Sequence, residues 1–281
     1  MTSRKTQRRI GDVLTYFVFA LALVFFGGPL LWVLSLSIRT QAEVYVTSLR
    51  LIPENPTLAN YTEVLYSAQF SVFLINSLKL SVAGSIGAMV VAAPAAYAFS
   101  RLSFRGNSTL LIGVLALQMI APLVIGIPLY RYFSRLNLLD SHFSTSMVYI
   151  AILVPLATWM LKGFFDGIPP ALDEAAMVDG CTRFGAFLRV TMPLILPGLT
   201  SVFVLTAILA WNEFTIPYIL LSKPSLLPVS IGILNFQGNY AETSQQVVAA
   251  GGVLAMLPAI ATFIILQRFI VRALTSGAIK G

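Results

Sequence analysis

The sequence predicts an all-α polytopic membrane protein with six transmembrane helices. Of its 281 residues, 57% are hydrophobic and only 10% are charged, whereas soluble domains contain roughly 45–50% apolar and about 25% charged residues. The mean hydropathy of +0.85 agrees. So few charged side chains cannot cover a water-facing surface of this size. The composition therefore excludes an ordinary cytosolic enzyme and indicates a chain that lies in a bilayer in contact with membrane lipid.

The apolar residues gather in long stretches without ionisable side chains. Each stretch is close to or above the ~20 residues that a helix needs to cross ~30 Å of hydrocarbon, and helices are the default there because lipid satisfies no backbone polar group. We expect a cytoplasmic N-terminal segment at 1–12, a six-span transmembrane domain at 13–275 and a cytoplasmic tail at 276–281. The spans are expected near 13–38, 72–100, 107–132, 143–163, 197–221 and 246–270.

The first span resembles a secretory signal because basic residues precede it. Its apolar run is longer than a signal's ~7–15 residues, and no clean small-x-small cleavage site follows, so we expect it to be retained. The distribution of the bases then predicts the orientation, because Lys and Arg are enriched on the cytoplasmic side. Twelve bases share one side with the two termini: Arg4, Lys5, Arg8, Arg9, Arg101, Arg105, Lys162, Arg183, Arg189, Arg268, Arg272 and Lys280. The other side has five, or six with Lys79: Arg39, Arg50, Arg131, Arg135 and Lys223.

The net charge of +7 follows from this asymmetry and needs no anionic partner. The bases are not clustered on one helix or in one tail, so no nucleic-acid footprint is expected. The single cysteine, Cys181, excludes an internal disulfide framework and a cysteine-based zinc site. The single histidine, His142, leaves little room for imidazole chemistry, and we expect no metal site.

Small residues recur at every fourth position of the second and sixth spans. Such faces let membrane helices approach each other closely. They comprise Gly84, Ala88, Ala92 and Ala96, and then Gly251, Ala255 and Ala259. At least one proline stands in every span, as expected where kinked helices line a pathway, although proline is also commoner in membrane helices generally. These prolines are Pro29, Pro94, Pro122, Pro155, Pro217 and Pro258.

The expected cytoplasmic loop at 164–196 carries the most specific local pattern. Pro169 and Pro170 are suited to the first turn of a helix, and Asp173 and Glu174 then stand at its positive end. Gly180 is expected to end this helix or bend it sharply. A short cytoplasmic helix with small residues on one face is suited to docking on another protein; the alternative is a solvated loop with an ordinary capped helix.

This loop resembles the EAA loop of ABC-importer permeases. The family pattern is Glu-Ala-Ala, three residues, Gly, nine residues, and then Ile-x-Leu-Pro. Here Glu174, Ala175 and Ala176 are followed by Gly180 at the expected offset and by Val190-Thr191-Met192-Pro193. Val190 and Met192 depart only conservatively, and Asp179 before the glycine also fits. The resemblance implies that Glu174, Ala175, Ala176, Asp179 and Gly180 couple the chain to an ATPase.

Three further segments resemble the maltose, trehalose and glycerol-phosphate type of carbohydrate permease, in particular its shorter, six-span subunit. They are Leu74–Leu80, Trp211-Asn212-Glu213-Phe214 and the ending at 277–281. The resemblance covers essentially the whole chain. It implies the type I ABC importer permease fold, with a second, unlike permease, two copies of an ABC ATPase and an extracytoplasmic solute-binding protein as partners.

The chain contains no GxxxxGK[ST] phosphate loop. It cannot cradle ATP by that route, so we expect no enzymatic activity and no cofactor bound by this chain. ATP and Mg would be bound by the partner ATPase.

Glu213 is the only carboxylate inside a predicted span, and an intramembrane acid is by default a functional candidate. Aromatic faces with amide or carboxylate groups suit hydroxyl-rich ligands. The candidate substrate pathway therefore comprises Trp211, Asn212, Glu213 and Tyr218, with Asn76, Gln118, Lys79 and Tyr130 as weaker members. The alternative is that these side chains form interhelical hydrogen bonds of about 0.6 kcal/mol each. For the four weaker members the structural alternative is favoured.

Other functions fit less well. An intramembrane protease would need a histidine near a serine nucleophile or a pair of acids in its spans, and this sequence offers neither. An ion-coupled secondary transporter would use Glu213 and Lys79, but no internal repeat is visible. An ABC permease for a non-sugar solute is the nearest alternative. The expected substrate is a di- or oligosaccharide, or a related polyol or glycerol-phosphate compound, and much of its pocket can belong to the partner permease.

Overall fold

The computed structural model describes residues 3–45, 50–234 and 244–276, which contain helices and no strand. The chain divides into two compact units, each described by itself. Unit 1 comprises Met1–Ala68 and Ile233–Met256, and unit 2 comprises Gln69–Gly232 and Leu257–Gly281. The terminal pattern at 277–281 lies outside the described residues.

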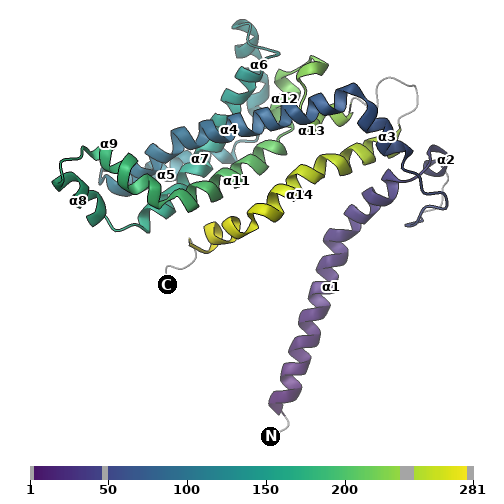
Figure 1. The fold of residues 1–281 in the computed structure, drawn as a ribbon, viewed down its shortest axis with the longest axis horizontal. Coiled ribbons are helices and arrows are strands. Elements are labelled where there is room, and N and C mark those ends of the chain that lie inside the picture. The colour runs from purple at the N-terminus through teal and green to yellow at the C-terminus, as the bar shows by residue number, and fades with distance from the viewer. Residues whose placement is uncertain (1–2, 46–49, 235–243, 277–281) are drawn as a thin grey trace. The chain divides into compact units, whose positions relative to one another are not determined.

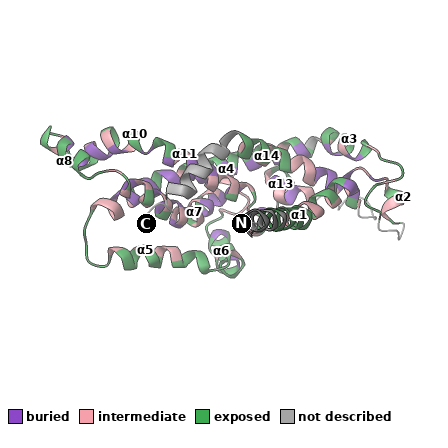
Figure 2. Cartoon of the chain, turned by 90° about the horizontal axis from the view of Figure 1, so that it is seen from below, coloured by how far each residue is buried: buried purple, intermediate pink, exposed green. Residues whose placement is uncertain are grey.

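Unit 1 contains α1 (Ser3–Ser37), α2 (Gln41–Val44), α3 (Ala59–Tyr66) and the first part of α14 (Gln245–Ser276). From Leu14 to Ser37, α1 has a mean hydropathy of 2.4, and its most apolar stretch is not buried in the structure. Figure 2 shows α1 as exposed over most of its described side chains. An apolar helix of this length that its own chain does not cover is consistent with the predicted first span.

The segment after α1 is held by buried polar side chains. Arg39 lies over the Trp32 ring at 5.1 Å and donates from Nη2 to Ser35 Oγ at 3.2 Å. Asn60 Nδ2 donates to the carbonyl oxygens of Ser37 and Arg39, at 2.9 and 2.8 Å. Since an unpaired buried backbone carbonyl is costly, these bonds stabilise the turn that leads from α1 to α3.

Unit 2 contains the long helices α4 and α7, and its remaining helices pack around them. All but the first residue of α4 belong to this unit. In Figure 1, α8 and α9 lie at one end of α4, α7 and α11, whereas α12 and α13 lie towards their other end. The elements are α4 (Ala68–Arg101), α5 (Asn107–Ala116), η1 (Leu117–Met119), α6 (Pro122–Arg135), α7 (His142–Asp166), α8 (Ala171–Val178), α9 (Arg183–Ala186), the π-helical η2 (Phe187–Thr191), α10 (Met192–Leu194), α11 (Leu196–Trp211), α12 (Thr215–Leu220), η3 (Pro224–Leu226), α13 (Val229–Gly232) and the part of α14 from Leu257 on.

Small residues bring the long helices of unit 2 close together. Ala88, Ala92 and Ala96 of α4 are completely buried. A Cβ atom added to Gly84 would lie 2.9 Å from the Cβ of Tyr149 on α7, so no larger residue fits there without a shift. The predicted close-packing face of the second span is thus confirmed, because its members lie at the helix contact.

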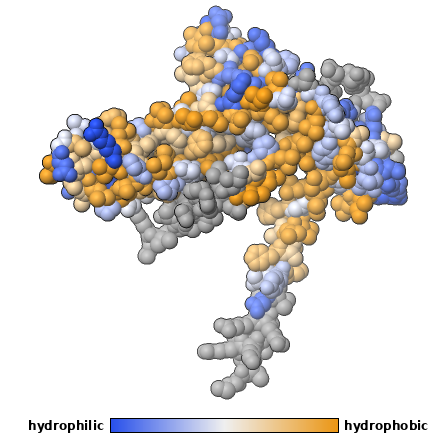
Figure 3. Space-filling view, viewed as in Figure 1, coloured by the Kyte–Doolittle hydropathy of each residue, from blue (hydrophilic) through white to orange (hydrophobic). Residues whose placement is uncertain are grey.

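Four helices are long and apolar enough to cross a membrane, and two bent helix pairs raise the number to six if each pair is one span. The described residues therefore accommodate the predicted six-span layout. Figure 3 shows the corresponding surface: hydrophobic side chains cover the flanks of the long helices, and hydrophilic ones lie at the α6 end of unit 2 and, among hydrophobic ones, at its α8 end.

The third and fifth spans differ from the straight helices that the uncharged stretches suggest. The third bends by 86° between Met119 and Pro122. Ile120 and Ala121 are extended there, and Pro122 opens α6 without needing an N–H donor. The second bent pair, Arg183–Leu194 with Leu196–Trp211, is bent by 77°. The predicted fifth span at 197–221 is also interrupted, because α11 ends at Trp211 and α12 begins only at Thr215. Hydropathy alone does not reveal these breaks, because residues 120–121 are uncharged and Glu213 is the only charged residue at 212–214.

Candidate functional site

The loop that is predicted to face the cytoplasm forms a short helix, α8, as the sequence predicts. Pro170 immediately precedes it, and Asp173 and Glu174 stand in its first turn. Carboxylates are favourable at this end, where the backbone N–H groups lack helical acceptors. The motif residues Ala175 and Ala176 occupy the middle of the helix, where alanine has the best helix propensity.

Gly180 ends α8 by a Schellman motif. Its φ of +89° is the left-handed conformation that glycine adopts without a steric penalty. The N–H of Gly180 donates to Met177 O at 3.1 Å, and the N–H of Cys181 donates to Ala176 O at 3.0 Å. These two bonds define the motif. The predicted role of Gly180 as helix terminator is confirmed, and the glycine of the EAA pattern has a clear stereochemical reason.

The helix has one buried and one exposed side. Asp173 and Ala176 are buried, with exposed fractions of 4% and 8%. The other side presents Leu172, Glu174, Ala175, Val178 and Asp179 to the surroundings. Of the five residues assigned to coupling, four (Glu174, Ala175, Asp179 and Gly180) are therefore exposed, whereas Ala176 packs inward.

Asp173 is held by groups from two other segments. Its Oδ2 accepts from Arg101 Nε at 2.6 Å, in an ion pair whose side chains are 9% and 6% exposed. Its Oδ1 accepts a hydrogen bond from the buried Thr191 hydroxyl. Arg101 is the last residue of α4, and Thr191 is the last residue of η2. Sequence reasoning placed Asp173 only at a helix N-terminus and missed this partnership, because Arg101 lies far away in the chain.

The end of α7 joins the same group of side chains. Ser100 Oγ donates to Asp166 Oδ1 at 2.7 Å, and Lys162 Nζ pairs with Asp166 Oδ2 at 2.7 Å. Arg101 Nη1 in turn donates to Ser100 Oγ at 3.2 Å. Beside this polar group, the ring of Tyr97 contacts those of Phe165 and Phe187, with centroids 5.6 and 4.9 Å apart.

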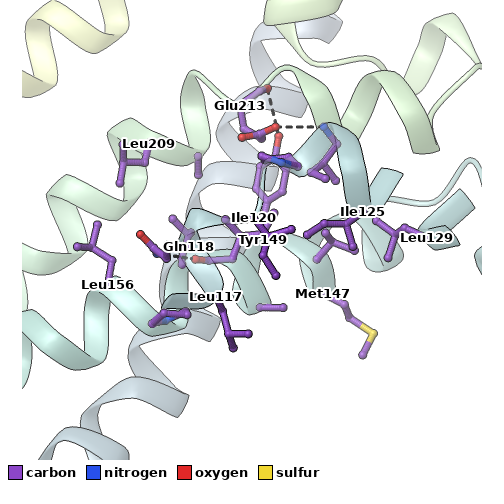
Figure 4. A pocket seen from close by; sticks show the side chains of 18 of the residues that line it. Leu117, Gln118, Ile120, Ile125, Leu129, Met147, Tyr149, Leu156, Leu209 and Glu213 are labelled. Carbon is purple, nitrogen blue, oxygen red and sulfur yellow. Dashed lines mark hydrogen bonds between the residues drawn. The ribbon is translucent and has the colours of Figure 1, made fainter. Parts of the chain in front are cut away.

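A second candidate region is a cavity of about 680 Å³ in unit 2. It lies where η1 and α6 meet α7 and the end of α11, and most of its lining is apolar. Its polar groups come from Gln118, Tyr132, Tyr149 and Glu213. Figure 4 shows Gln118 and Glu213 on different sides of this space, with Tyr149 between them. An apolar cavity with a few convergent polar groups is the usual form of a small-molecule site.

Glu213 stands in the break between α11 and α12. Its Oε1 accepts from the N–H of Ile216 at 3.1 Å, which satisfies one of the free donors at the start of α12. Its carbonyl oxygen accepts from Ser230 Oγ at 3.0 Å and from Tyr149 OH at 3.5 Å. Within the described part of the chain, no ion pair neutralises this carboxylate.

The other predicted pathway residues are distributed differently. Gln118 lines the cavity and donates to Ile152 O at 3.1 Å. Trp211, Asn212 and Tyr218 are not part of the cavity lining; Asn212 bonds back to Ile208 O at 2.8 Å, and Tyr218 stacks on Phe214 at 5.3 Å. The structure therefore does not gather the four residues of the fifth span around one space.

Asn76 is buried, and its amide donates to the carbonyls of Ser225 and Leu227, at 2.9 and 3.1 Å. These bonds fix η3 against α4, so the geometry favours the structural alternative for this residue. Lys79 is exposed and Tyr130 is 46% exposed; neither lines the cavity. The two cavity residues that sequence reasoning missed, Tyr132 and Tyr149, carry no local signal, since tyrosine is common in membrane helices.

Comparison with known proteins defines the class of protein. Residues 84–276 match the family described as binding-protein-dependent transport system inner membrane component. The chain belongs to this family: it is an inner-membrane permease of ABC importers and a multi-pass membrane protein.

Characterised relatives cover nearly the whole chain. It is 33% identical to the sulfoquinovosyl glycerol transport system permease protein SmoH of Agrobacterium fabrum, over 90% of this chain and 88% of that one. It is 35% identical to the trehalose transport system permease protein SugB of Mycobacterium tuberculosis, over 90% and 92%. The galactooligosaccharides transport system permease protein GanQ of Bacillus subtilis is 31% identical over the full length of both chains.

A solved structure confirms the fold. A chain from a bacterial ABC transporter that imports the acidic polysaccharide alginate superposes with a TM-score of 0.75, at 23% identity, over 95% of this chain and 98% of that chain. The predicted all-α ABC importer permease fold is therefore correct.

Proposed function

We propose that this chain is a permease subunit that translocates a di- or oligosaccharide, or a related glycoside of a polyol, delivered by an extracytoplasmic binding protein. The three relatives named above act on a glycerol glycoside, a disaccharide and galactooligosaccharides. All three substrates are glycosides, and this shared chemistry is the observation that carries the substrate class. A glycerol-phosphate compound would also fit the resemblance to the maltose, trehalose and glycerol-phosphate type of permease.

The partners follow from the architecture of this class. Because the chain has no phosphate loop, its energy must come from a separate ATPase, which would bind ATP and Mg. We place α8 against that ATPase, with Glu174, Ala175, Asp179 and Gly180 at the contact and Ala176 beneath it. A second, unlike permease would complete the pathway.

The proposed orientation puts α8 and both termini in the cytoplasm. It is supported by the excess of bases on that side of the predicted topology. ATP binding would close the two ATPase copies, draw the coupling helices of the two permeases together and open the cavity outward. Hydrolysis would reset the cycle.

The cavity beside Glu213 is the proposed part of the pathway in this chain. Gln118, Tyr132 and Tyr149 add an amide and two phenols to its wall, and these are groups that bond sugar hydroxyls. Trp211, Asn212 and Tyr218 lie outside this wall and would act, if at all, at another position along the pathway.

The experiment is a mild-detergent pull-down of the tagged chain from its native membrane, with the partners identified by mass spectrometry. Recovery of a second permease and an ATPase with a phosphate loop supports the proposal. The co-purified binding protein is then screened by calorimetry against trehalose, galactobiose, glycerol 3-phosphate and, as non-sugar solutes, glutamine and spermidine.

Two results would contradict the proposal. Binding of glutamine or spermidine but of none of the glycosides or glycerol 3-phosphate would indicate a non-sugar permease. A chain recovered alone, also after crosslinking, would favour an ion-coupled transporter, with Glu213 as the group to examine.

A further inference from the structure

The buried face of α8 carries a more specific arrangement than the docking surface on its other side. Both carboxylate oxygens of Asp173 are engaged: Oδ2 by Arg101 Nε at 2.6 Å and Oδ1 by the Thr191 hydroxyl. Thr191 is completely buried, and Asp173 is 4% exposed. The carboxylate therefore ties α8 to two segments at once, the end of α4 and the end of η2.

Arg101 is equally engaged. Besides Asp173, it donates from Nη2 to Ile168 O at 2.8 Å and from Nη1 to Ser100 Oγ at 3.2 Å. Its planar guanidinium thus bonds in three directions and fixes the chain on both sides of the turn that precedes α8. Such a fork-shaped group holds geometry better than a lysine ammonium does.

The connection extends to α7 and α11. Ser100 Oγ donates to Asp166, the last residue of α7, and Asp166 is also paired with Lys162. On the other side, Thr191 is followed directly by α10 and then by α11. One buried ion pair therefore stands at the point where the ends of α4 and α7 and the lead-in to α11 converge on α8.

A buried ion pair of this kind is weak evidence for a role in stability. Apolar residues of similar volume often replace such pairs without loss, whereas removal of one partner leaves an uncompensated charge. The ion pair supplies a directional connection, which apolar contacts do not supply. Packed elements that share such a bond move as one body.

We infer that the Arg101–Asp173 ion pair is the link through which a displacement of α8 moves the ends of α4, α7 and α11 together. Arg101 and Asp173 are then positioning residues for transport: neither contacts substrate or nucleotide, and both act through α8. This inference rests on the proposed docking of α8 on an ATPase, and it specifies how that movement reaches the transmembrane helices.

The test measures whether α8 and α4 move together. The complete complex, with its partner permease, ATPase and binding protein, is placed in lipid nanodiscs. Nitroxide labels are attached to the native Cys181, directly after α8, and to Leu78→Cys on the exposed surface of α4. Pulsed dipolar spectroscopy gives the distance between the labels without nucleotide and after trapping with ATP, Mg and vanadate.

Three variants are compared with the native pair. Asp173→Asn removes one charge with little change in shape. Arg101→Met with Asp173→Leu replaces the pair by apolar groups and avoids an unpaired buried charge. Arg105→Gln is the matched control, because it removes an exposed base four residues after Arg101.

In the native complex and in Arg105→Gln, we expect the same label distance in both states, within the ~2 Å typical of small helix shifts. In Asp173→Asn and in the apolar double variant, we expect the distance to change by more than that on trapping, because α8 moves without α4. ATP hydrolysis should continue in these variants, but it should no longer move the transmembrane helices. The coupling between hydrolysis and this movement should fall about tenfold. A stability defect alone would lower the yield of complex without a state-dependent change in distance.

An unchanged distance in both states for Asp173→Asn and for the double variant would overturn the inference. If Asp173→Asn fails to assemble, the double variant decides. If neither assembles and Thr191→Val behaves as the native protein, the pair is needed only for folding, which also overturns the inference. A native complex that traps no ADP with vanadate would instead contradict the proposed function, so the two failures are distinguishable.

Discussion

Two carboxylates of unit 2, Asp173 in the proposed coupling loop and Glu213 beside the cavity, have different surroundings. At the coupling loop, Asp173 is buried, paired with Arg101 and bonded to Thr191. At the cavity, the Glu213 carboxylate accepts from the backbone N–H of Ile216 through Oε1, and no described cation pairs with it. An acid that is fully engaged fixes the position of a helix. An acid with free acceptor capacity beside a cavity remains available to a ligand.

The difference extends to the surrounding groups. At the α8 end of unit 2, side chains of opposite charge form ion pairs, such as Lys162 with Asp166. The cavity wall is apolar apart from two tyrosines, one glutamine and Glu213. We therefore expect the two regions to respond differently to substitution: the first through coupling, and the second through substrate transport.

The largest effect is expected from Glu174→Lys combined with Gly180→Pro. Proline cannot adopt a φ of +89° and removes the N–H that bonds Met177 O, so the end of α8 is lost. Uptake into proteoliposomes should fall by about 100-fold, the upper range of coupling energies between sites, while ATP hydrolysis loses its dependence on the binding protein.

Gly106→Pro is the control for this loss, because Gly106 also has a positive φ, of +85°, but lies outside α8. It should leave hydrolysis dependent on the binding protein. Normal uptake by the Glu174→Lys/Gly180→Pro variant would exclude α8 from the coupling path.

Glu213→Gln tests the other region. A glutamine carbonyl can still accept from the Ile216 N–H, so the start of α12 should be preserved while the charge is lost. If the carboxylate bonds a substrate hydroxyl, uptake should fall about tenfold, as for a lost hydrogen bond to a charged group. Uptake kinetics and thermal unfolding are measured together.

Glu213→Ala is the companion variant, since it removes the bond to Ile216 as well and should cost about 1 kcal/mol of stability, as for a lost helix cap. Native uptake by Glu213→Gln would assign this residue a structural role only.

Gly198→Val tests the packing that supports both regions. A Cβ at Gly198 would lie 2.5 Å from Phe164 Cγ, so valine forces α11 away from α7. Overpacking of this kind costs about 1–3 kcal/mol, and thermal unfolding in detergent should occur at a lower temperature. Gly163→Ala on α7 has open space around it and serves as the control; equal melting of the two variants would contradict the close α7–α11 contact.

The smallest effect is expected from Tyr218→Ala. Tyr218 is 64% exposed and contacts Phe214 by stacking, away from the cavity lining. Exposed substitutions usually change stability by less than about 0.5 kcal/mol, so uptake per folded molecule should change less than about twofold. A tenfold loss measured by the same assay would place Tyr218 on the substrate path or at a partner contact, and would restore the predicted grouping with Glu213.

The features that could be predicted from the sequence are those with local causes. Uncharged stretches indicate spans because lipid excludes charge, and Gly180 ends α8 because the left-handed conformation there requires glycine. The small-residue face of α4 follows from its fourth-position spacing. These predictions depend on residues within a few turns of one another.

The features that could not be predicted depend on contacts between distant residues. Arg101 and Asp173 each have an ordinary local explanation, as a base at the end of a predicted span and a helix N-terminal acid, so nothing in either position indicates the pair. Tyr149 lines the cavity from α7, and its Cβ also lies close to Gly84 of α4, a contact between residues far apart in the sequence. The polarity of Asn76 predicts a pathway residue, whereas its amide donates to two carbonyls of the segment at and after η3.

The central claim, that α8 docks on an ATPase, is tested most directly by a photo-crosslinker placed at Val178, which is 87% exposed on α8. The tagged chain is irradiated in its native membrane, and the crosslinked product is identified by mass spectrometry. We predict a product with a subunit that carries a phosphate loop, and no such product from a crosslinker at Leu78 on α4. A crosslinker at Val178 that captures only lipid, or only this chain itself, would contradict the account.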